Sequence, residues 1–156
     1  MNAAILHSLN SKWEIREVET LKPSANQVLI KINASGLCYT NVHITKGDLP
    51  LPLNFPLILG HEPAGEIVEV GESITTRKKG DRVGVPWVQK TCGRCEWCQR
   101  GKRLFCEKQQ GTGVTLHGAM QSICYLIQML QYYYQMKFRM NKLHLYFVLA
   151  ILYIMD

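Results

Sequence analysis

The sequence predicts a mainly β domain over residues 1–120, built as a small barrel or sandwich of short strands and followed by a tail of different character. Short β-branched runs separated by Gly and Pro are typical of such folds. All 12 glycines and all 6 prolines precede residue 119, so the composition changes sharply near residue 120. With 156 residues, 47% of them apolar, the chain can form one hydrophobic core.

The strands and helices follow from local patterns within residues 1–120. Strands are expected at QVLIKI (27–32), GEIVEV (65–70) and DRVGV (81–85). Short helices are expected over residues 39–45, ended by Gly47, and over residues 96–100, ended by Gly101. Residues 47–60 are rich in proline, so they should form an extended loop with few strand hydrogen bonds.

The tail, residues 121–156, has six of the seven tyrosines, four of the six methionines and one acidic residue, Asp156. It lacks helix breakers and is apolar nearly all round, which predicts a helix from Ile123 to Met155. Its most apolar piece, residues 143–155, is shorter than the roughly 20 residues of a membrane helix, so a membrane anchor is the less favoured interpretation. A frame change or truncation in an A/T-rich gene would explain this composition.

The N-terminus has no basic segment and only a short apolar run, which predicts no signal peptide. A cytoplasmic chain with reduced thiols is therefore expected. The formal charge is +6. No Lys/Arg run is interleaved with aromatic residues, so the sequence predicts no nucleic-acid partner.

Four cysteines form the clearest motif, C-x2-C-x2-C-x7-C. They are Cys92, Cys95, Cys98 and Cys106. This spacing suits four thiolates around one structural Zn²⁺, with glycines supplying the tight turns. An iron–sulfur cluster is less favoured because no C-x3-C-P follows Cys98. A redox pair is less favoured because four thiols at ligand spacing are better explained by a closed metal site, and disulfides are less favoured because reduced thiols are expected. A site closed by four protein ligands adds folding energy and no chemistry.

Two further candidate ligands, Cys38 and His61, lie upstream, and on spacing alone each would be a core residue. Three segments change that interpretation: GLCYTNVHITKGDLP (36–50), PLILGHEPAGEIVEVGESITTRKKGDRVGVPW (56–87) and CGRCEWCQRGKRLFC (92–106). Together they resemble the N-terminal catalytic domain of the zinc-dependent alcohol dehydrogenases, in the medium-chain dehydrogenase/reductase superfamily. The resemblance implies a GroES-like, partly open β-barrel with the four cysteines as a structural zinc lobe.

The resemblance also implies a catalytic zinc at Cys38 and His61, with Glu62 able to enter the coordination sphere when a ligand leaves. Thr40 matches the hydroxyl that accepts the proton of a small alcohol substrate, and His43 matches the end of that proton relay. Three positions depart from the family pattern. Tyr39 replaces a histidine that approaches the cofactor phosphates, Asn41 replaces a charged partner of the metal site, and Leu49 replaces a tryptophan of the substrate pocket.

Family members transfer hydride to NAD(P) bound by a G-x-G-x-x-G fingerprint. Here GTGVTLHG (111–118) places Leu116 where the third glycine belongs, and the third catalytic zinc ligand has no match, since Cys124 is the only spare cysteine. We therefore expect a truncated dehydrogenase that does not turn over alone, with one firmly held zinc and a weak second site. The alternative is a non-catalytic zinc module that associates with full-length subunits, or with a membrane through its tail.

Overall fold

The computed structural model describes residues 1–20 and 22–127. Its elements are β1 Asn2–Leu6, β2 Glu14–Glu17, β3 Gln27–Ser35, α1 Thr40–Lys46, β4 Leu57–Ile58, β5 Pro63–Val70, β6 Arg82–Gly84, β7 Val88–Lys90, α2 Glu96–Gln99, the 3-10 helix η1 Arg103–Phe105, β8 Gln110–Gly111 and β9 Ile123–Ile127. The strands form three antiparallel sheets with the orders β2-β1-β4, β6-β5-β3-β9 and β7-β8. The mainly β architecture predicted from the sequence is confirmed.

The four-stranded sheet holds the first core. Strand β3 pairs with β5 on one side and with β9 on the other. Its apolar residues are covered by residues from β5, β6 and the connection between them; the buried cluster comprises Val28, Ile30, Ile67, Ile74, Val83 and Val85. Burial of this many branched side chains is the main stabilising contribution, at about 1.5–3 kcal/mol for each side chain that is fully buried.

A second core fastens α1 to the barrel. It joins β1, α1, β4 and a later loop through Leu6, Ile44, Leu57, Leu59 and Val114, all of them buried. Helix α1 is further held by the Trp13 indole N–H, which donates to the Thr45 hydroxyl at 3.0 Å. This core fixes the position of the segment that carries the candidate residues Cys38, Thr40 and His43.

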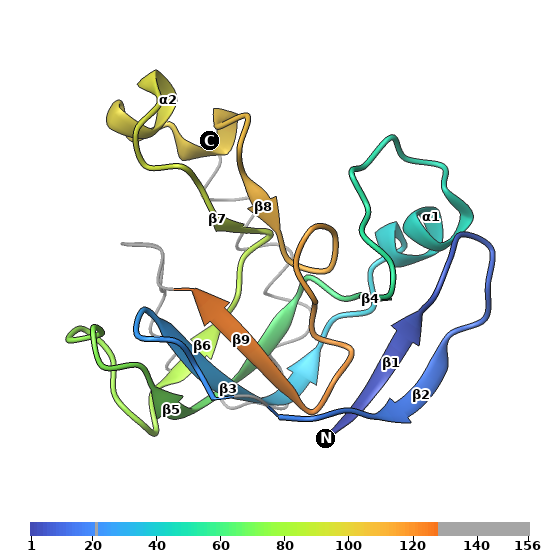
Figure 1. The fold of residues 1–156 in the computed structure, drawn as a ribbon, viewed down its shortest axis with the longest axis horizontal. Helices are drawn as coiled ribbons and strands as arrows, with labels where there is room; N and C mark the ends of the chain where they lie inside the picture. The colour runs from blue at the N-terminus through green and yellow to red at the C-terminus, as the bar shows by residue number, and fades with distance from the viewer. Residues whose placement is uncertain (21, 128–156) are drawn as a thin grey trace.

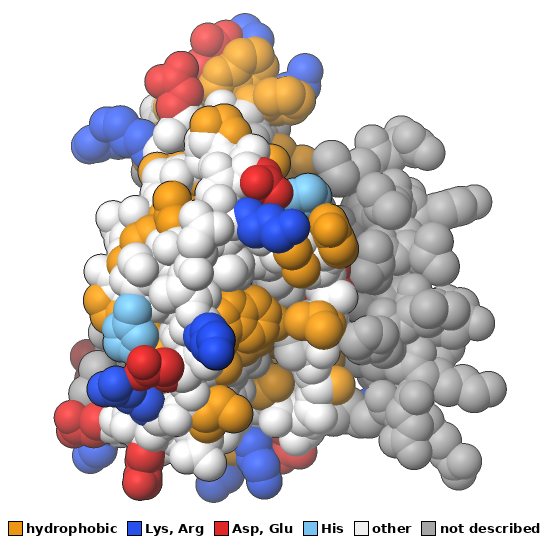
Figure 2. Space-filling model, turned by 90° about the vertical axis from the view of Figure 1, so that its right-hand side faces the viewer, with side chains coloured by type: hydrophobic (Ala, Val, Ile, Leu, Met, Phe, Trp, Pro, Cys, Tyr) orange, Lys and Arg blue, Asp and Glu red, His pale blue; other side chains and the backbone are white. Residues whose placement is uncertain are grey.

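The two groups of candidate residues lie in different parts of the molecule. In Figure 1, α2 and η1 form a lobe at the end of the β7-β8 ribbon, whereas α1 lies beside β1 and β4 on the other side of the barrel. Figure 2 shows acidic and basic side chains interspersed over the described part of one face, which therefore presents no continuous basic surface. Among the described residues, no helix is long and apolar enough to cross a membrane.

Both short helices predicted from the sequence are present, and their ends agree within one or two residues. Gly47 ends α1 with φ of +78°, a left-handed conformation that suits glycine. The predicted loop over residues 47–60 includes a short strand that the sequence analysis missed, because β4 pairs with β1 through only two residues, Leu57 and Ile58.

The helix predicted to begin at Ile123 is wrong over its first five residues. Ile123–Ile127 forms β9, which pairs antiparallel with β3 from Lys31↔Ile123 to Gln27↔Ile127. An apolar run without clear periodicity does not distinguish helix from strand, and here the free edge of β3 decides the outcome by offering backbone hydrogen bonds. The remainder of the predicted helix, to Met155, lies outside the described residues.

Candidate functional site

The four-cysteine lobe brings together the sulfurs that its spacing predicts. The Sγ atoms of Cys92, Cys95, Cys98 and Cys106 all lie within 4.8 Å of one another, and Cys92 and Cys98 are 3.9 Å apart. A tetrahedral zinc with Zn–S bonds of about 2.3 Å requires sulfurs about 3.8 Å apart. The donor set and its dimensions therefore fit a zinc ion.

Local backbone geometry creates this cluster. Gly93 and Gly101 adopt φ of +72° and +76°, which turns the chain sharply on either side of α2. Backbone N–H groups also point at sulfur: that of Cys95 donates to Cys92 Sγ at 3.3 Å, and that of Cys92 donates to Cys106 Sγ at 3.5 Å. Since all ligands come from residues 92–106, the site is closed and local.

The thiols of the lobe influence one another. The backbone N–H groups of Arg94 and Cys95 stabilise the Cys92 thiolate and lower the pKa of Cys92 to about 6. At Cys95 the backbone N–H of Cys98 acts in the same direction, but burial and the neighbouring thiols outweigh it and raise the pKa of Cys95 to about 11. A dication among these sulfurs would favour all four thiolates.

A second cluster forms where β3 ends and β5 begins. Ligand atoms of Cys38, His61 and Glu62 lie within 4.8 Å of one another. The pairing of Ser35 with Pro63 brings the two segments together, and the Gly36 N–H donates to the Glu62 carbonyl at 3.0 Å. These ligands, far apart in sequence, therefore meet because the β3-β5 ladder continues up to the cluster.

Gly36 is a positioning residue that the sequence analysis missed. A Cβ atom at this position would collide with the Glu62 carboxylate and would lie 2.9 Å from Glu62 Cβ. Only glycine therefore leaves room for the Glu62 side chain beside Cys38. A glycine two residues before a candidate cysteine was the available signal, but its meaning depends on a partner that follows 26 positions later.

His61 has the environment of a neutral imidazole. It is 7% exposed and packs edge-on against the Trp87 ring, with centroids 4.8 Å apart. Burial lowers the pKa of His61, which keeps the ring uncharged, as a metal ligand must be. Its Nδ1 atom is buried and has no hydrogen-bond partner among the described residues, and Nε2 lies 3.7 Å from Glu62 Oε1.

The segment 111–118 supports the backbone just before His61. Gly113 has φ of +70°, and a Cβ there would lie 2.7 Å from the Gly60 carbonyl oxygen. A Cβ at Gly118 would collide with the same carbonyl group, while the Ala119 N–H donates to it at 3.0 Å. Of the glycines in this segment, Gly113 and Gly118 therefore permit close packing around Gly60, whereas Gly111 lies against Trp87.

The two predicted relay residues occupy different positions. Thr40 lies beside the second cluster, since the Cys38 thiol donates to its hydroxyl at 3.3 Å. His43 is one turn further along α1 and outside the cluster. Its Nδ1 lies 3.0 Å from Asp48 Oδ2, and both side chains are partly exposed.

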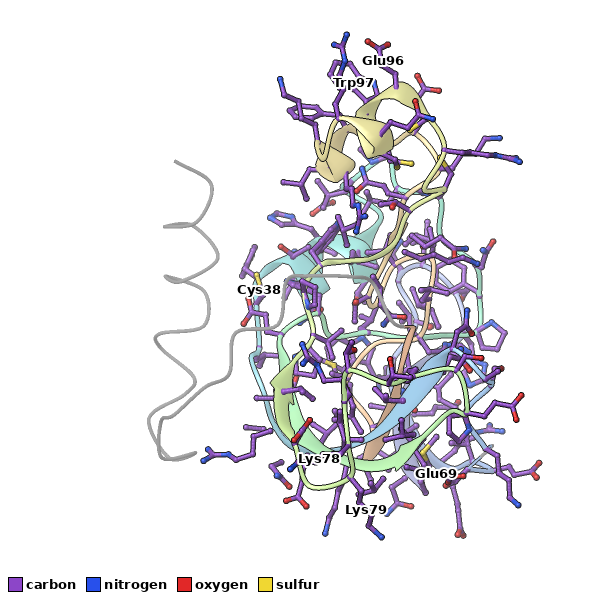
Figure 3. The ribbon with its side chains drawn as sticks, turned by 90° about the vertical axis from the view of Figure 1, so that its left-hand side faces the viewer. Cys38, Glu69, Lys78, Lys79, Glu96 and Trp97 are labelled. Atoms are coloured by element: carbon purple, nitrogen blue, oxygen red, sulfur yellow. The ribbon has the colours of Figure 1, made fainter. Side chains whose placement is uncertain are left out.

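Two of the departures from the family pattern, Asn41 and Leu49, lie in different surroundings. Asn41 is fully buried, and neither atom of its side-chain amide has a hydrogen-bond partner among the described residues. Leu49 is 36% exposed, just beyond α1. Figure 3 shows Cys38 well apart from Trp97 and Glu96 of the lobe, so the two clusters are separate sites.

Comparisons with known proteins identify the family of this chain. Residues 24–132 match the model of the alcohol dehydrogenase GroES-like domain. An alcohol dehydrogenase of Geobacillus stearothermophilus is 41% identical over 124 residues, which is 80% of this chain and 37% of the relative. The chain thus spans little more than a third of that relative's length.

Two solved structures share the fold. An alcohol dehydrogenase of Escherichia coli CFT073 complexed with NADH is 31% identical, with a TM-score of 0.73 over 81% of this chain and 36% of that one. A thermostable alcohol dehydrogenase of Pyrobaculum aerophilum with cobalt and zinc bound is 26% identical, with a TM-score of 0.73 over 81% and 39%. This chain therefore belongs to the alcohol dehydrogenase GroES-like domain family.

Proposed function

We propose that this chain supplies the zinc-holding and alcohol-binding part of a zinc-dependent alcohol dehydrogenase. The observation that carries the proposal is the convergence of Cys38, His61 and Glu62 from two distant segments onto one point, with a hydroxyl beside it. A thiol, a neutral imidazole and a carboxylate suit zinc. The Nε2 atom of His61 lies 3.7 Å from Glu62 Oε1, a gap too long for a hydrogen bond.

The zinc of this second site, when bound, would polarise the oxygen of a small alcohol as a Lewis acid. Thr40 would accept the alcohol proton, because its hydroxyl already lies 3.3 Å from the sulfur of Cys38. His43, partly exposed at the end of α1, would release that proton to solvent. The four-cysteine lobe would hold the other zinc, a structural one, through its four thiolates and would take no part in proton transfer.

Hydride transfer also requires a nicotinamide acceptor held near the alcohol carbon. The relative from Escherichia coli was solved with NADH, which supports NAD(P) as the acceptor of the complete enzyme. Within residues 111–118, Gly113 and Gly118 pack against Gly60 and Gly111 lies against Trp87, which leaves no free glycine-rich turn there for a pyrophosphate. We therefore propose that residues 1–156 do not oxidise alcohols by themselves.

Metal stoichiometry tests the proposal. We expect the purified chain to retain close to one zinc per molecule after dialysis, held by the lobe, and to take up a second equivalent only at higher free zinc. Cobalt substitution should give a thiolate charge-transfer band from each site. In Cys38→Ser the band of the weaker site should vanish, whereas the band of the lobe should persist.

Three outcomes would contradict this view. Two equally tight zincs would show that the second site is complete within these residues. Alcohol-dependent reduction of NAD by the purified chain would show that it is competent alone. A Cys38→Ser variant with unchanged binding of the second metal equivalent would remove Cys38 from the site, while stable co-purification with a full-length dehydrogenase would instead favour a role in partner association.

A further inference from the structure

The end of α1 holds a carboxylate against His43. Gly47 turns the chain back in the left-handed conformation, and its N–H donates to the Ile44 carbonyl at 3.2 Å. The N–H of Asp48 then donates to the His43 carbonyl at 3.0 Å. This turn returns Asp48 to the residue five positions earlier, where its Oδ2 lies 3.0 Å from His43 Nδ1.

A second contact restrains the same imidazole. The Tyr39 ring, one helical turn before His43, meets it edge-on with centroids 4.9 Å apart. The aromatic contact restrains the plane of the imidazole, whereas the carboxylate engages one of its two nitrogens. Together, the two contacts restrain a histidine side chain that would otherwise rotate freely at the surface.

The chemistry of the pair determines where the proton of His43 resides. A carboxylate only accepts hydrogen bonds, so the nitrogen that faces it must carry the hydrogen. A neutral imidazole has one N–H and one lone pair, so a proton on Nδ1 leaves Nε2 as the base. Orientation of a histidine tautomer by a carboxylate is a general device of proton-transfer sites.

We propose that Asp48 is a positioning residue that fixes His43 as the Nδ1–H tautomer, so that Nε2 is the atom that takes up the relayed proton. This inference deepens the proposed function and rests on it for the role of His43. It does not rest on any metal, because neither Asp48 nor His43 belongs to the two clusters of candidate ligands. The simple alternative is an exposed ion pair that ends a helix and contributes little.

Nitrogen NMR of the imidazole distinguishes these possibilities. In ¹⁵N-labelled 156-residue chain loaded with one equivalent of zinc, at a pH where the ring is neutral, long-range ¹H–¹⁵N spectra report which nitrogen is protonated. We expect His43 to be mainly Nδ1–H. In Asp48→Ala the ratio of Nδ1–H to Nε2–H should fall by at least about fivefold, the upper end of what an exposed charged contact supports, and Asp48→Glu should restore part of it.

Asp81→Asn is the matched control, because it removes one carboxylate from a different turn, where Asp81 Oδ2 accepts the Lys78 N–H at 3.1 Å. It should leave the His43 signals unchanged. Backbone shifts of α1 and retention of the lobe zinc establish that each variant is folded. A wild-type His43 that is mainly Nε2–H, or an unchanged tautomer ratio in folded Asp48→Ala, would overturn the inference, whereas a second site that fails to bind metal would count only against the proposed function.

Discussion

The two clusters of candidate ligands use the chain in opposite ways. The four sulfurs of the lobe come from residues 92–106 and meet through glycine turns and one short helix. The second cluster joins Cys38 to His61 and Glu62 through the β3-β5 ladder, and the segment after β8 supports it from behind. The comparison teaches that local turns assemble the lobe, whereas the folded barrel assembles the second site.

The largest expected effect follows removal of a lobe ligand. Cys106 is 1% exposed and accepts the Cys92 N–H, so Cys106→Ser should abolish the tightly held zinc and unfold residues 92–106. Structural zinc binding in small domains is worth about 10–16 kcal/mol. Metal analysis and limited proteolysis of the lobe measure this change, and amide exchange in β3 and β5 should remain protected.

That outcome would establish that the lobe is an independent, metal-dependent unit. Cys38→Ser is the control, because it removes one thiol from the other cluster and should leave the lobe zinc in place. Collapse of the whole barrel in Cys106→Ser, with loss of exchange protection in the four-stranded sheet, would instead show that the two regions fold as one unit.

The next effect is confined to the second site. His61→Ala removes the imidazole. Loss of a residue that only hydrogen-bonds a metal ligand can weaken metal binding by up to about 100-fold, and loss of the ligand itself should weaken binding of the second equivalent of cobalt by more than that. The four-stranded sheet should persist, although removal of a side chain packed on Trp87 lowers the free energy of unfolding. A cobalt titration followed by absorption checks this. Unchanged affinity for the second equivalent would exclude His61 as a ligand.

A glycine behind the second site provides a smaller and sharper test. Gly113→Ala forces a side chain into a left-handed backbone and against the Gly60 carbonyl at 2.7 Å. Gly80→Ala has the same backbone problem, with φ of +91°, but nothing lies within 4 Å of its Cβ position. Strain alone costs about 1–3 kcal/mol, so both variants should be destabilised, and Gly113→Ala should lose more in denaturant unfolding.

The two glycine variants, Gly113→Ala and Gly80→Ala, also separate an effect on packing from an effect on metal binding. Only Gly113→Ala should weaken the second cobalt equivalent, because only that substitution displaces the backbone before His61. Equal losses in the two variants, in stability and in cobalt affinity, would mean that the close approach at Gly60 does not position His61.

The same division between local and distant contacts explains what the sequence could predict. The strands at residues 27–32, 65–70 and 81–85, both short helices and the four sulfurs of the lobe depend on nearby residues, and periodicity, turn glycines and ligand spacing reveal them. Strand β9 and the supports of the second site depend on distant partners. Nothing local in Ile123–Ile127 indicates that β3 has a free edge, and nothing near Gly36 indicates the Glu62 carboxylate.

The smallest effect concerns pH, and here too the two sites should differ. Thiols must lose protons to bind zinc, so zinc affinity of the lobe should fall as pH falls, by up to about tenfold per pH unit for each proton displaced. Backbone N–H groups lower the pKa of Cys92 to about 6, so this thiolate is available above that pH and is lost as the pH drops through it. The dependence should therefore become steeper below about pH 6.

His61 should add no such step to the second site near the ordinary pKa of histidine, because burial lowers its pKa and keeps the ring neutral as the pH falls through that value. Competition of each site with a chelator across a series of pH values measures both slopes in one experiment. If the slope of lobe zinc affinity against pH stays constant below about pH 6, Cys92 is still protonated above that pH. If zinc affinity of the second site shows a step near the ordinary pKa of histidine, His61 is less buried than its contact with Trp87 requires.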